Sequence, residues 1–187
     1  MTLTSISSPL HLLSSNNEQY GDTPPLTSSY HEPPSNADYS TNPSVFGQIL
    51  NGNLPCRTYN ESTNLLAFRD KSPRAKFHAL VIPKRYIKNI STLTSSDVEL
   101  LKEMRAMGLN LLQTHQPEAY ATQDFTMCYH IPPFNSVDHL HLHILAPVSE
   151  MNYLYKIKYW CGTRWCASEE VVVQRLEEGL SAVPFGW

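Results

Sequence analysis

The sequence predicts an α+β fold in which an antiparallel β-sheet is flanked by helices. Three observations predict it. Apolar residues recur at helical spacing in three segments, short apolar or alternating segments of strand length lie between them, and the order is helix, strands, long helix, strands, helix. With 187 residues and 41% hydrophobic content, the chain is long enough for one ordinary domain.

The first 44 residues differ in composition from the rest of the chain. They are rich in Ser, Thr, Asn and Pro, contain two Pro-Pro pairs, and show neither a helical nor a strand period. Such a segment cannot bury enough apolar surface to fold. We therefore expect a disordered N-terminal extension over residues 1–44 and a folded domain over residues 45–182.

The first half of the domain begins with a helix from Val45 to Leu50, with Ser44 as its N-cap, which ends at Asn51-Gly52. A strand over 64–70 follows, then a turn at 71–73. A second, buried strand begins at residue 76 and stops at Pro83.

The strongest helix signal covers residues 95–115, with apolar residues on one face and a capping box formed by Ser96 and Glu99. The remaining segments are a strand over 124–131, an irregular loop over 132–138, a strand over 139–147, an aromatic strand over 153–160, and a helix over 168–180 with acidic residues in its first turn.

Charge and composition argue against several partners. The net charge is -3 and the pI is near 6.2, so there is no strong nucleic-acid signal. No stretch approaches the roughly 18 apolar residues of a membrane helix, and we see no secretory signal. The four cysteines form no Cys-x-x-Cys pair, so we expect reduced thiols in an intracellular protein.

Three histidines alternate with apolar residues at positions 139–145. If this segment is a strand, His139, His141 and His143 share one face while the intervening apolar residues share the other. Leucines on one face can then pack on a core while three imidazoles line a site. Such placement is improbable by chance when the chain has eight histidines.

This pattern allows three interpretations. Two of the histidines can bind zinc, but the outer pair lies about 13 Å apart in a strand, and no obvious third ligand stands in the sequence. A neutral imidazole can instead attack phosphorus while its neighbours donate hydrogen bonds to phosphate oxygens. The third interpretation is a row of hydrogen-bonded structural histidines. Nucleophilic catalysis explains the pattern best.

The segment His139-Leu-His-Leu-His-Ile-Leu145 resembles the motif of the histidine triad (HIT) superfamily, His-φ-His-φ-His-φ-φ with φ apolar. "VFGQIL" from Val45 resembles the opening helix of the histidine triad nucleotide-binding (Hint) branch. "LLAFRDKSPRAKFHALVIPKRYI", over 65–87, resembles a second motif of that branch. The resemblance covers about residues 45–180, is nearest to the third Hint subgroup, and implies a HIT-like fold.

The resemblance implies a role for each matching histidine. His141 is the expected nucleophile, which becomes nucleotidylated, and His143 is expected to bind the α-phosphate and the bridging atom. His139 is expected to orient the nucleophile, and His78 matches an upstream histidine that supports the same network.

Other matching residues are expected to bind the nucleotide. Phe46, Phe68 and Val45 would form the slot for the purine, although the two aromatic residues fit a core equally well. Asp70 would bind the ribose hydroxyls, or else cap the adjacent turn. Ser136 would contact the phosphate or the leaving group.

The sequence also departs from the Hint pattern. Residues 132–135, Pro-Pro-Phe-Asn, replace a glycine-containing stretch, and Cys128 replaces an asparagine found near the phosphate in the first subgroup. The Cys-x-x-Cys pair that some members carry before the opening helix is absent, so we expect no family-type structural zinc. We expect no cofactor and no metal ligand among the site residues.

Taken together, these features predict a hydrolase of adenosine 5'-phosphoramidates or acyl-adenylates that works through a covalent nucleotidyl-histidine. A dinucleoside polyphosphate hydrolase and a non-catalytic nucleotide-binding or scaffold protein are the alternatives. The expected partner is a purine nucleotide conjugate. The resemblance further implies a homodimer, and we expect a cytoplasmic or nuclear location.

Overall fold

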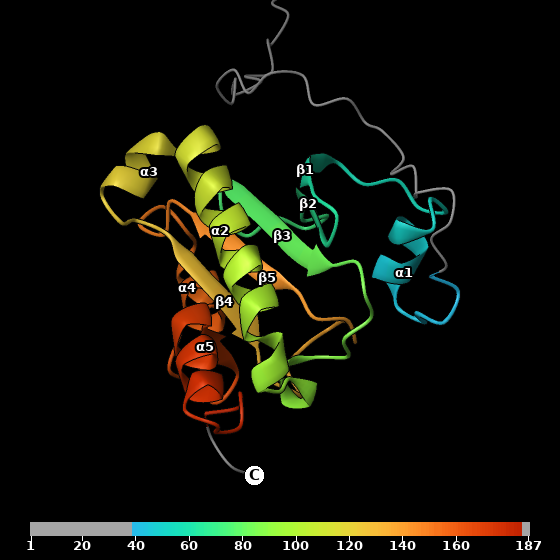
Figure 1. The fold of residues 1–187 in the computed structure, drawn as a ribbon. Helices are drawn as coiled ribbons and strands as arrows, with labels where there is room; N and C mark the ends of the chain where they lie inside the picture. The colour runs from blue at the N-terminus through green and yellow to red at the C-terminus, as the bar shows by residue number, and fades with distance from the viewer. Residues whose placement is uncertain (1–38, 185–187) are drawn as a thin grey trace, which may run out of the picture.

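The computed structural model describes residues 39–184. Its centre is a six-stranded antiparallel sheet with the strand order β1-β2-β3-β5-β4-β6 (Figure 1). The strands are β1 Thr58–Glu61, β2 Leu65–Arg69, β3 Phe77–Pro83, β4 Thr126–His130, β5 Leu142–Ala146 and β6 Cys166–Ser168. The antiparallel sheet predicted from the sequence is therefore confirmed.

The helices surround this sheet. They are α1 Val45–Leu50, α2 Val98–His115, α3 Pro117–Ala121, α4 Tyr153–Lys158 and α5 Glu169–Glu177, with two short 3-10 helices at Ile90–Thr92 and Ser95–Asp97. Helix α2 crosses one face of the sheet (Figure 1). Helix α1 lies to the right of β3 in this view and packs against side chains of β2 and β3 on the opposite face. Among these helices, none has both the length and the apolar character needed to cross a bilayer.

Each face of the sheet has its own apolar cluster, because side chains alternate along every strand. One face packs under α2 and α5 through Ala79, Val81, Leu142, Ile144 and Leu101, among others. The opposite face packs under α1 at one end through Phe46, Leu50, Leu66, Phe68 and Leu80. At its other end it packs under α4 and the following loop through Cys128, Leu145, Met151, Tyr159 and Cys166.

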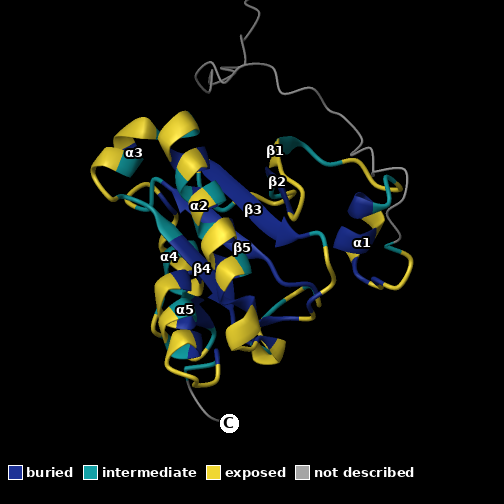
Figure 2. Ribbon diagram, in the orientation of Figure 1, coloured by how far each residue is buried: buried dark blue, intermediate teal, exposed yellow. Residues whose placement is uncertain are grey.

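The two central strands are buried on both faces. All residues of β3 and of β5 are buried, and both strands are dark blue in Figure 2. A strand buried in this way is normally a continuous apolar run. His78 on β3 and His143 on β5 interrupt that run, so both imidazoles are held inside the protein with their environment set by packing.

Most of the predicted elements are confirmed, but the segment predicted as an aromatic strand over 153–160 is a helix. Its N-cap is Asn152, whose side chain accepts a hydrogen bond from the Leu154 amide. Tyr155 and Tyr159, four residues apart, pack on one side while Tyr153 is exposed. This spacing is helical, so the prediction was wrong because the aromatic content was weighted above the period.

The start of α2 also differs from the prediction. The capping box is formed by Thr94 and Asp97, not by Ser96 and Glu99, because the 3-10 turn Ser95–Asp97 precedes the α-helix. The backbone amide of Thr94 donates to Asp97 Oδ2 at 2.7 Å. The short elements β1, β6 and α3 were not predicted from the sequence.

Residues 39–44, which the sequence assigned to the extension, pack against the domain. Ser44 caps α1 as predicted, since its Oγ accepts from the amide of Gly47. Asn42 is buried, and its Oδ1 accepts hydrogen bonds from the amide and the hydroxyl of Ser44. The remainder of the predicted extension, residues 1–38, lies outside the described residues.

Helix α2 approaches the sheet closely at Gly108. A Cβ atom at this position would lie 2.6 Å from Ile144 Cδ1 and 3.0 Å from Met127 Sδ. We expect Gly108→Val to lower the free energy of unfolding by about 1–3 kcal/mol, because overpacking displaces the helix or strains its neighbours.

The matched control is Ala106→Val on the exposed side of the same helix, which costs only helix propensity, about 0.5 kcal/mol. Urea unfolding of both variants measures the difference. Equal losses of stability would show that α2 does not need the small residue for its close approach.

Candidate active site

The candidate site lies on the sheet face opposite α2, between the ends covered by α1 and α4. Because paired residues of antiparallel strands share a face, His78 on β3 lies opposite Leu145 on β5, and His143 on β5 lies between Leu80 on β3 and Cys128 on β4. The alternation predicted from the sequence thus places two of the four histidines on the sheet itself.

The strand carrying the three alternating histidines is shorter than predicted. Strand β5 begins at Leu142, so His139 and His141 precede it, and only His143 belongs to the strand. The rings of His141 and His143 lie 4.9 Å apart between centroids. Leu140 lies, as predicted, with the core on the α2 side. Strand β5 begins late because residues 131–141 form the loop that connects it to β4.

His139 is fully buried and its tautomer is determined by its partners. Its Nδ1 lies 2.8 Å from Asn42 Nδ2, an amide that can only donate. The other ring nitrogen, Nε2, therefore carries the proton and donates to the carbonyl of Pro83 at 2.8 Å. His139 thus joins the segment before α1, the end of β3 and the histidine segment.

His141 is oriented by the backbone of His139. Its Nδ1 lies 2.6 Å from the carbonyl oxygen of His139, which can only accept, so the proton sits on Nδ1. Nε2 then carries a lone pair, and it has no hydrogen-bond partner within residues 39–184. A neutral imidazole held in this way presents a nucleophilic nitrogen.

His78 sets the opposite tautomer on His143. The amide of Arg74 donates to His78 Nδ1 at 3.2 Å, so His78 Nε2 carries the proton. It donates to His143 Nδ1 at 2.9 Å. The proton of His143 is therefore on Nε2, which is buried and has no partner in the described part of the chain. This N–H is available to a ligand beside His141.

Burial keeps these imidazoles neutral. It lowers the pKa of His141, and it lowers that of His143 well below the usual range. Burial lowers the pKa of His78 to about 4, although the carboxylate of Asp70 opposes the shift. Near pH 7 the site therefore holds uncharged histidines, as a nucleophilic imidazole requires.

Two residues that the sequence did not single out complete this cluster. The His130 ring on β4 lies 5.0 Å from the His143 ring, and Tyr159 lies 5.2 Å from it. His130 Nδ1 bonds the carbonyl of Trp165, while its Nε2 is buried without a partner in the residues described. A polar residue in a buried strand was a usable signal for His130. Tyr159 gave none, because its segment was assigned to a strand.

The predicted purine-binding residues are only partly brought together. Phe46 contacts the His141 ring at 5.4 Å and the Phe68 ring at 5.5 Å. Both phenylalanines also belong to the apolar cluster under α1, so they have the core role that the sequence allowed as an alternative to purine binding. They also form an apolar wall beside His141. Val45 is 45% exposed and does not belong to that cluster.

Asp70 and Ser136 take different positions. Asp70 Oδ1 accepts from the amide of Ser72 at 2.7 Å, which is the turn-capping alternative, while Oδ2 lies 3.6 Å from His78 Nε2. Ser136 is exposed in the loop before β5 and makes no hydrogen bond to the four histidines in the described structure. Asp70 therefore adjoins the histidine network, whereas Ser136 does not contact it.

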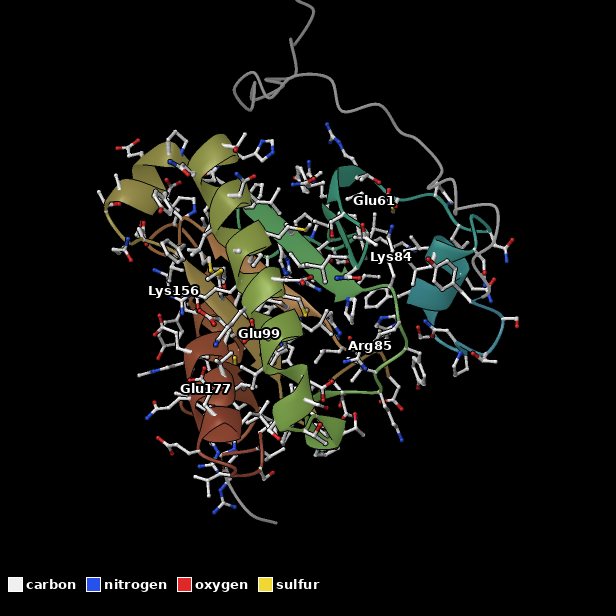
Figure 3. All side chains as sticks on the ribbon, in the orientation of Figure 1. Glu61, Lys84, Arg85, Glu99, Lys156 and Glu177 are labelled. Atoms are coloured by element: carbon white, nitrogen blue, oxygen red, sulfur yellow. The ribbon has the colours of Figure 1, made fainter. Side chains whose placement is uncertain are left out.

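Lys84 and Arg85, which the sequence left outside the site, form ion pairs. Lys84 Nζ lies 2.6 Å from Glu61 Oε1 (Figure 3), and Arg85 pairs with Asp97. A cavity of about 690 Å³ adjoins these two cations and contains none of the four histidines. Hydrogen-bond geometry therefore locates the site better than cavity size does.

The structure supplies the third metal ligand that the sequence lacked, because Asp70, His78 and His143 place ligand atoms within 4.8 Å of one another. However, the 2.9 Å between His78 Nε2 and His143 Nδ1 is a hydrogen-bond distance, whereas two nitrogens on one tetrahedral zinc lie about 3.3 Å apart. Donation from the Arg74 amide orients His78 for that hydrogen bond. The arrangement fits a proton network.

Comparison with known proteins agrees with this geometry. Residues 43–159 match the family model described as scavenger mRNA decapping enzyme C-term binding. The adenosine 5'-monophosphoramidase HINT3 of Mus musculus is 32% identical over 136 residues, which are 72% of this chain and 81% of the relative. The bifunctional adenosine 5'-phosphosulfate phosphorylase/adenylylsulfatase HINT4 of Arabidopsis thaliana is 38% identical over 54% of this chain and 68% of its own.

A solved structure is similar as well. The HIT family hydrolase from Legionella pneumophila Philadelphia 1 superposes with a TM-score of 0.50 and 32% identity, over 55% of this chain and 90% of its own. The family model thus spans the residues that carry the histidine cluster, including His78, His141 and His143.

The neutral state of His139 generates a pH prediction. Burial lowers its folded-state pKa from 6.5 to about 4, so the unfolded chain binds the additional proton between these values. This contribution to the free energy of unfolding is present above pH 6.5 and is lost as the pH falls towards 4.

His139→Gln removes the titrating group, so the slope of the free energy of unfolding against pH becomes shallower by up to about 1.4 kcal/mol per pH unit in this window. Urea unfolding of both proteins between pH 4 and pH 7 measures the slopes. Parallel slopes would mean that His139 is not buried in its neutral form.

Proposed function

Because the chain belongs to the histidine triad superfamily and to its Hint-like branch, we propose that it is a nucleotide hydrolase acting on adenosine 5'-phosphoramidates. The observation that carries this proposal is the pair of opposite tautomers: His141 presents a bare Nε2, and His143 presents an Nε2–H beside it. One nitrogen is ready to attack phosphorus and the other to donate a hydrogen bond.

The names of the relatives support an adenosine 5'-nucleotide with a leaving group on its α-phosphate. HINT3 proteins of Mus musculus, Xenopus tropicalis and Danio rerio are named adenosine 5'-monophosphoramidases. The Arabidopsis thaliana relative is named for adenosine 5'-phosphosulfate chemistry. We include acyl-adenylates in the proposed substrate class, because they too lose a leaving group from the α-phosphate of AMP.

In the proposed first step, the lone pair of His141 Nε2 forms a bond to the α-phosphorus while the bond from phosphorus to the leaving nitrogen or oxygen breaks. The His141 imidazole becomes cationic. The hydrogen bond from its Nδ1–H to the carbonyl of His139 is already formed and stabilises this charge. The Nε2–H of His143 donates to a phosphoryl oxygen or to the leaving atom. The leaving amine takes up a proton from solvent and departs, and the proton that water releases in the second step balances it.

In the second step, a water oxygen attacks the phosphorus of the nucleotidyl-histidine. The bond from phosphorus to His141 Nε2 breaks, the electron pair returns to the imidazole, and the water proton is released. The products are AMP and the original neutral His141. This covalent intermediate is a proposal that follows from the position of the nitrogen.

The nucleotide itself would lie across the wall formed by Phe46 and Phe68, with the purine against the apolar surface that adjoins His141. We propose that Asp70 binds the ribose hydroxyls, and that Val45 borders the purine. Ser136, on the exposed loop before β5, would reach the leaving group only if that loop closes over the substrate.

Two further expectations come from the family resemblance: a homodimer, and a cytoplasmic or nuclear location. Both stay predictions. The Leu-rich and Met-rich face of α2 is largely used within the chain, since Leu101, Met104 and Leu111 are buried against its own sheet. A dimer would have to use other surfaces or the partly buried margin of this helix. Light scattering after size exclusion measures the oligomeric state.

The first functional prediction concerns the nucleophile. Wild-type protein incubated with adenosine 5'-phosphoramidate is expected to release AMP, whereas His141→Ala lowers kcat by at least about 10³-fold, since no other described group can replace the attacking nitrogen. The matched control is His115→Ala, a histidine on α2 that stacks on Phe77 outside the site, which should retain wild-type turnover. AMP release followed by chromatography gives the rates.

The outcomes separate the alternatives. If both wild type and variant release AMP equally, the assignment of His141 is wrong. If wild type cleaves dinucleoside polyphosphates but not the phosphoramidate, the protein is a polyphosphate hydrolase. If it binds AMP without cleaving either substrate, it is a nucleotide-binding or scaffold protein. A mass increase of one AMP group on wild type, absent from His141→Ala, would identify the covalent intermediate.

A further inference from the structure

Three of the four cysteines converge beside the active site. The sulfur atoms of Cys128, Cys161 and Cys166 all lie within 4.8 Å of one another. Cys128 and Cys166 are fully buried, and Cys161 is partly exposed. Cys56 stands apart and contacts Thr58. The convergence involves residues from three elements, so sequence spacing gave no sign of it.

The backbone between α4 and β6 is shaped to bring two of these thiols together. Gly162 has a φ of +84°, a conformation that favours glycine, and its amide donates to the carbonyl of Cys166 at 3.1 Å. This turn directs Cys161 and Cys166 back to the same place. The indole N–H of Trp165 donates to the carbonyl of Ile157, which ties the turn to α4.

The third thiol comes from the sheet. Cys128 lies on β4, directly opposite Ser168 on β6, while Cys166 lies opposite His130 on the same pair of strands. Paired residues share a face, so Cys128, Cys166 and His130 belong to the sheet face that carries His143, and the turn brings Cys161 to them. The opening of the cluster at Cys161 gives an ion a route from solvent.

We propose that Cys128, Cys161 and Cys166 form a site for a zinc ion. Zinc prefers thiolate ligands at about 2.3 Å in a tetrahedron, which separates the sulfur atoms by about 3.8 Å. The three sulfur atoms lie within 4.8 Å of one another, so side-chain movements of about 1 Å bring them to this spacing. Three thiolates occupy three corners of the tetrahedron, and one nitrogen or oxygen ligand completes it.

This site shares no ligand with the metal site considered for the histidines. It also differs in position from the Cys-x-x-Cys pair that some family members carry before the opening helix. Its ligands come from strands β4 and β6 and from the turn before β6, with four residues between Cys161 and Cys166. The Cys128 thiol is adjacent in register to His143. Tyr159, which contacts the rings of His78, His130 and His143, directly precedes the turn. A bound ion would therefore hold the wall of the histidine cluster in place.

Two other states of the cluster compete with zinc binding. In one, two of the thiols form a disulfide and the third stays free. In the other, the thiols are ordinary buried residues of the apolar cluster with Leu145 and Met151. The three states differ in metal content and in the number of reactive thiols under denaturing conditions, so both quantities are measured together.

The experiment uses the full-length chain purified under reducing conditions. We expect about one zinc per chain by elemental analysis, and after removal of zinc with a chelator, one equivalent of Co²⁺ should give near-ultraviolet sulfur-to-cobalt charge-transfer absorption of a three-thiolate site. Zinc should also raise the Tm of the apo protein, because it binds the folded state. These readouts do not depend on hydrolase activity.

Cys161→Ser is the test variant because its side chain is the partly exposed one and a serine is tolerated there most easily. We expect it to weaken metal binding by at least about 100-fold and to abolish the Tm increase. Cys56→Ser is the matched control and should bind metal like wild type. Circular dichroism checks that each variant is folded.

The proposal is overturned if wild-type protein with four free thiols takes up neither zinc nor cobalt. It is also overturned if Cys161→Ser binds as tightly as wild type, or if non-reducing mass spectrometry of protein alkylated in the lysate, before any reductant is added, finds a disulfide among the three residues. If Cys161→Ser does not fold, the cobalt spectrum of the wild type decides the question by itself.

Discussion

Burial of β3 and β5 on both faces is the constraint on which the rest of the structure depends. These strands form the centre of the sheet, with α2 on one face and α1 and α4 on the other. An imidazole placed there loses its hydration, so its neutral form is favoured and its nitrogens need partners. His78 Nε2 and His143 Nδ1 meet that need through one another, and the Arg74 amide sets the direction of their hydrogen bond, while His143 Nε2 has no partner in the described residues. The tautomers of these histidines are thus a consequence of packing.

The two ends of the domain close the site from opposite sides. Near the N-terminus, Asn42 donates to His139, whose backbone carbonyl in turn orients His141. Near the C-terminus, α4 carries Tyr159 onto the rings of the histidine cluster, and the turn with Cys161 follows it. Both segments lie outside the long helix and the central strands, yet each determines the position of a ring. The contacts of Asn42 and Tyr159 therefore stabilise the fold and also position the rings of the histidine cluster.

Much of the fold could be predicted because its strongest signals are local. The period of α2, the apolar alternation of β3 and the N-cap at Ser44 depend on near neighbours in the chain. The errors arose where local signals compete. The aromatic segment over 153–160 has high strand propensity, but packing of Tyr155 and Tyr159 on one side favoured a helix. The short strand β6 has three residues and depends on β4 for its hydrogen bonds, so nothing local announces it.

The sequence by itself determined the chemical type of the site: alternating histidines with apolar residues between them, an upstream histidine, and motifs in an order that indicates the superfamily. These are properties of residue identity and spacing. The tertiary structure decided which nitrogen of His139 and of His143 carries a proton, because that depends on partners 56 to 97 residues away in the chain: Pro83 and Asn42 for His139, and His78 for His143. It also decided the membership of His130, Tyr159 and the three thiols. Contacts between distant segments form only when the sheet brings them together, and no spacing rule along the chain encodes them.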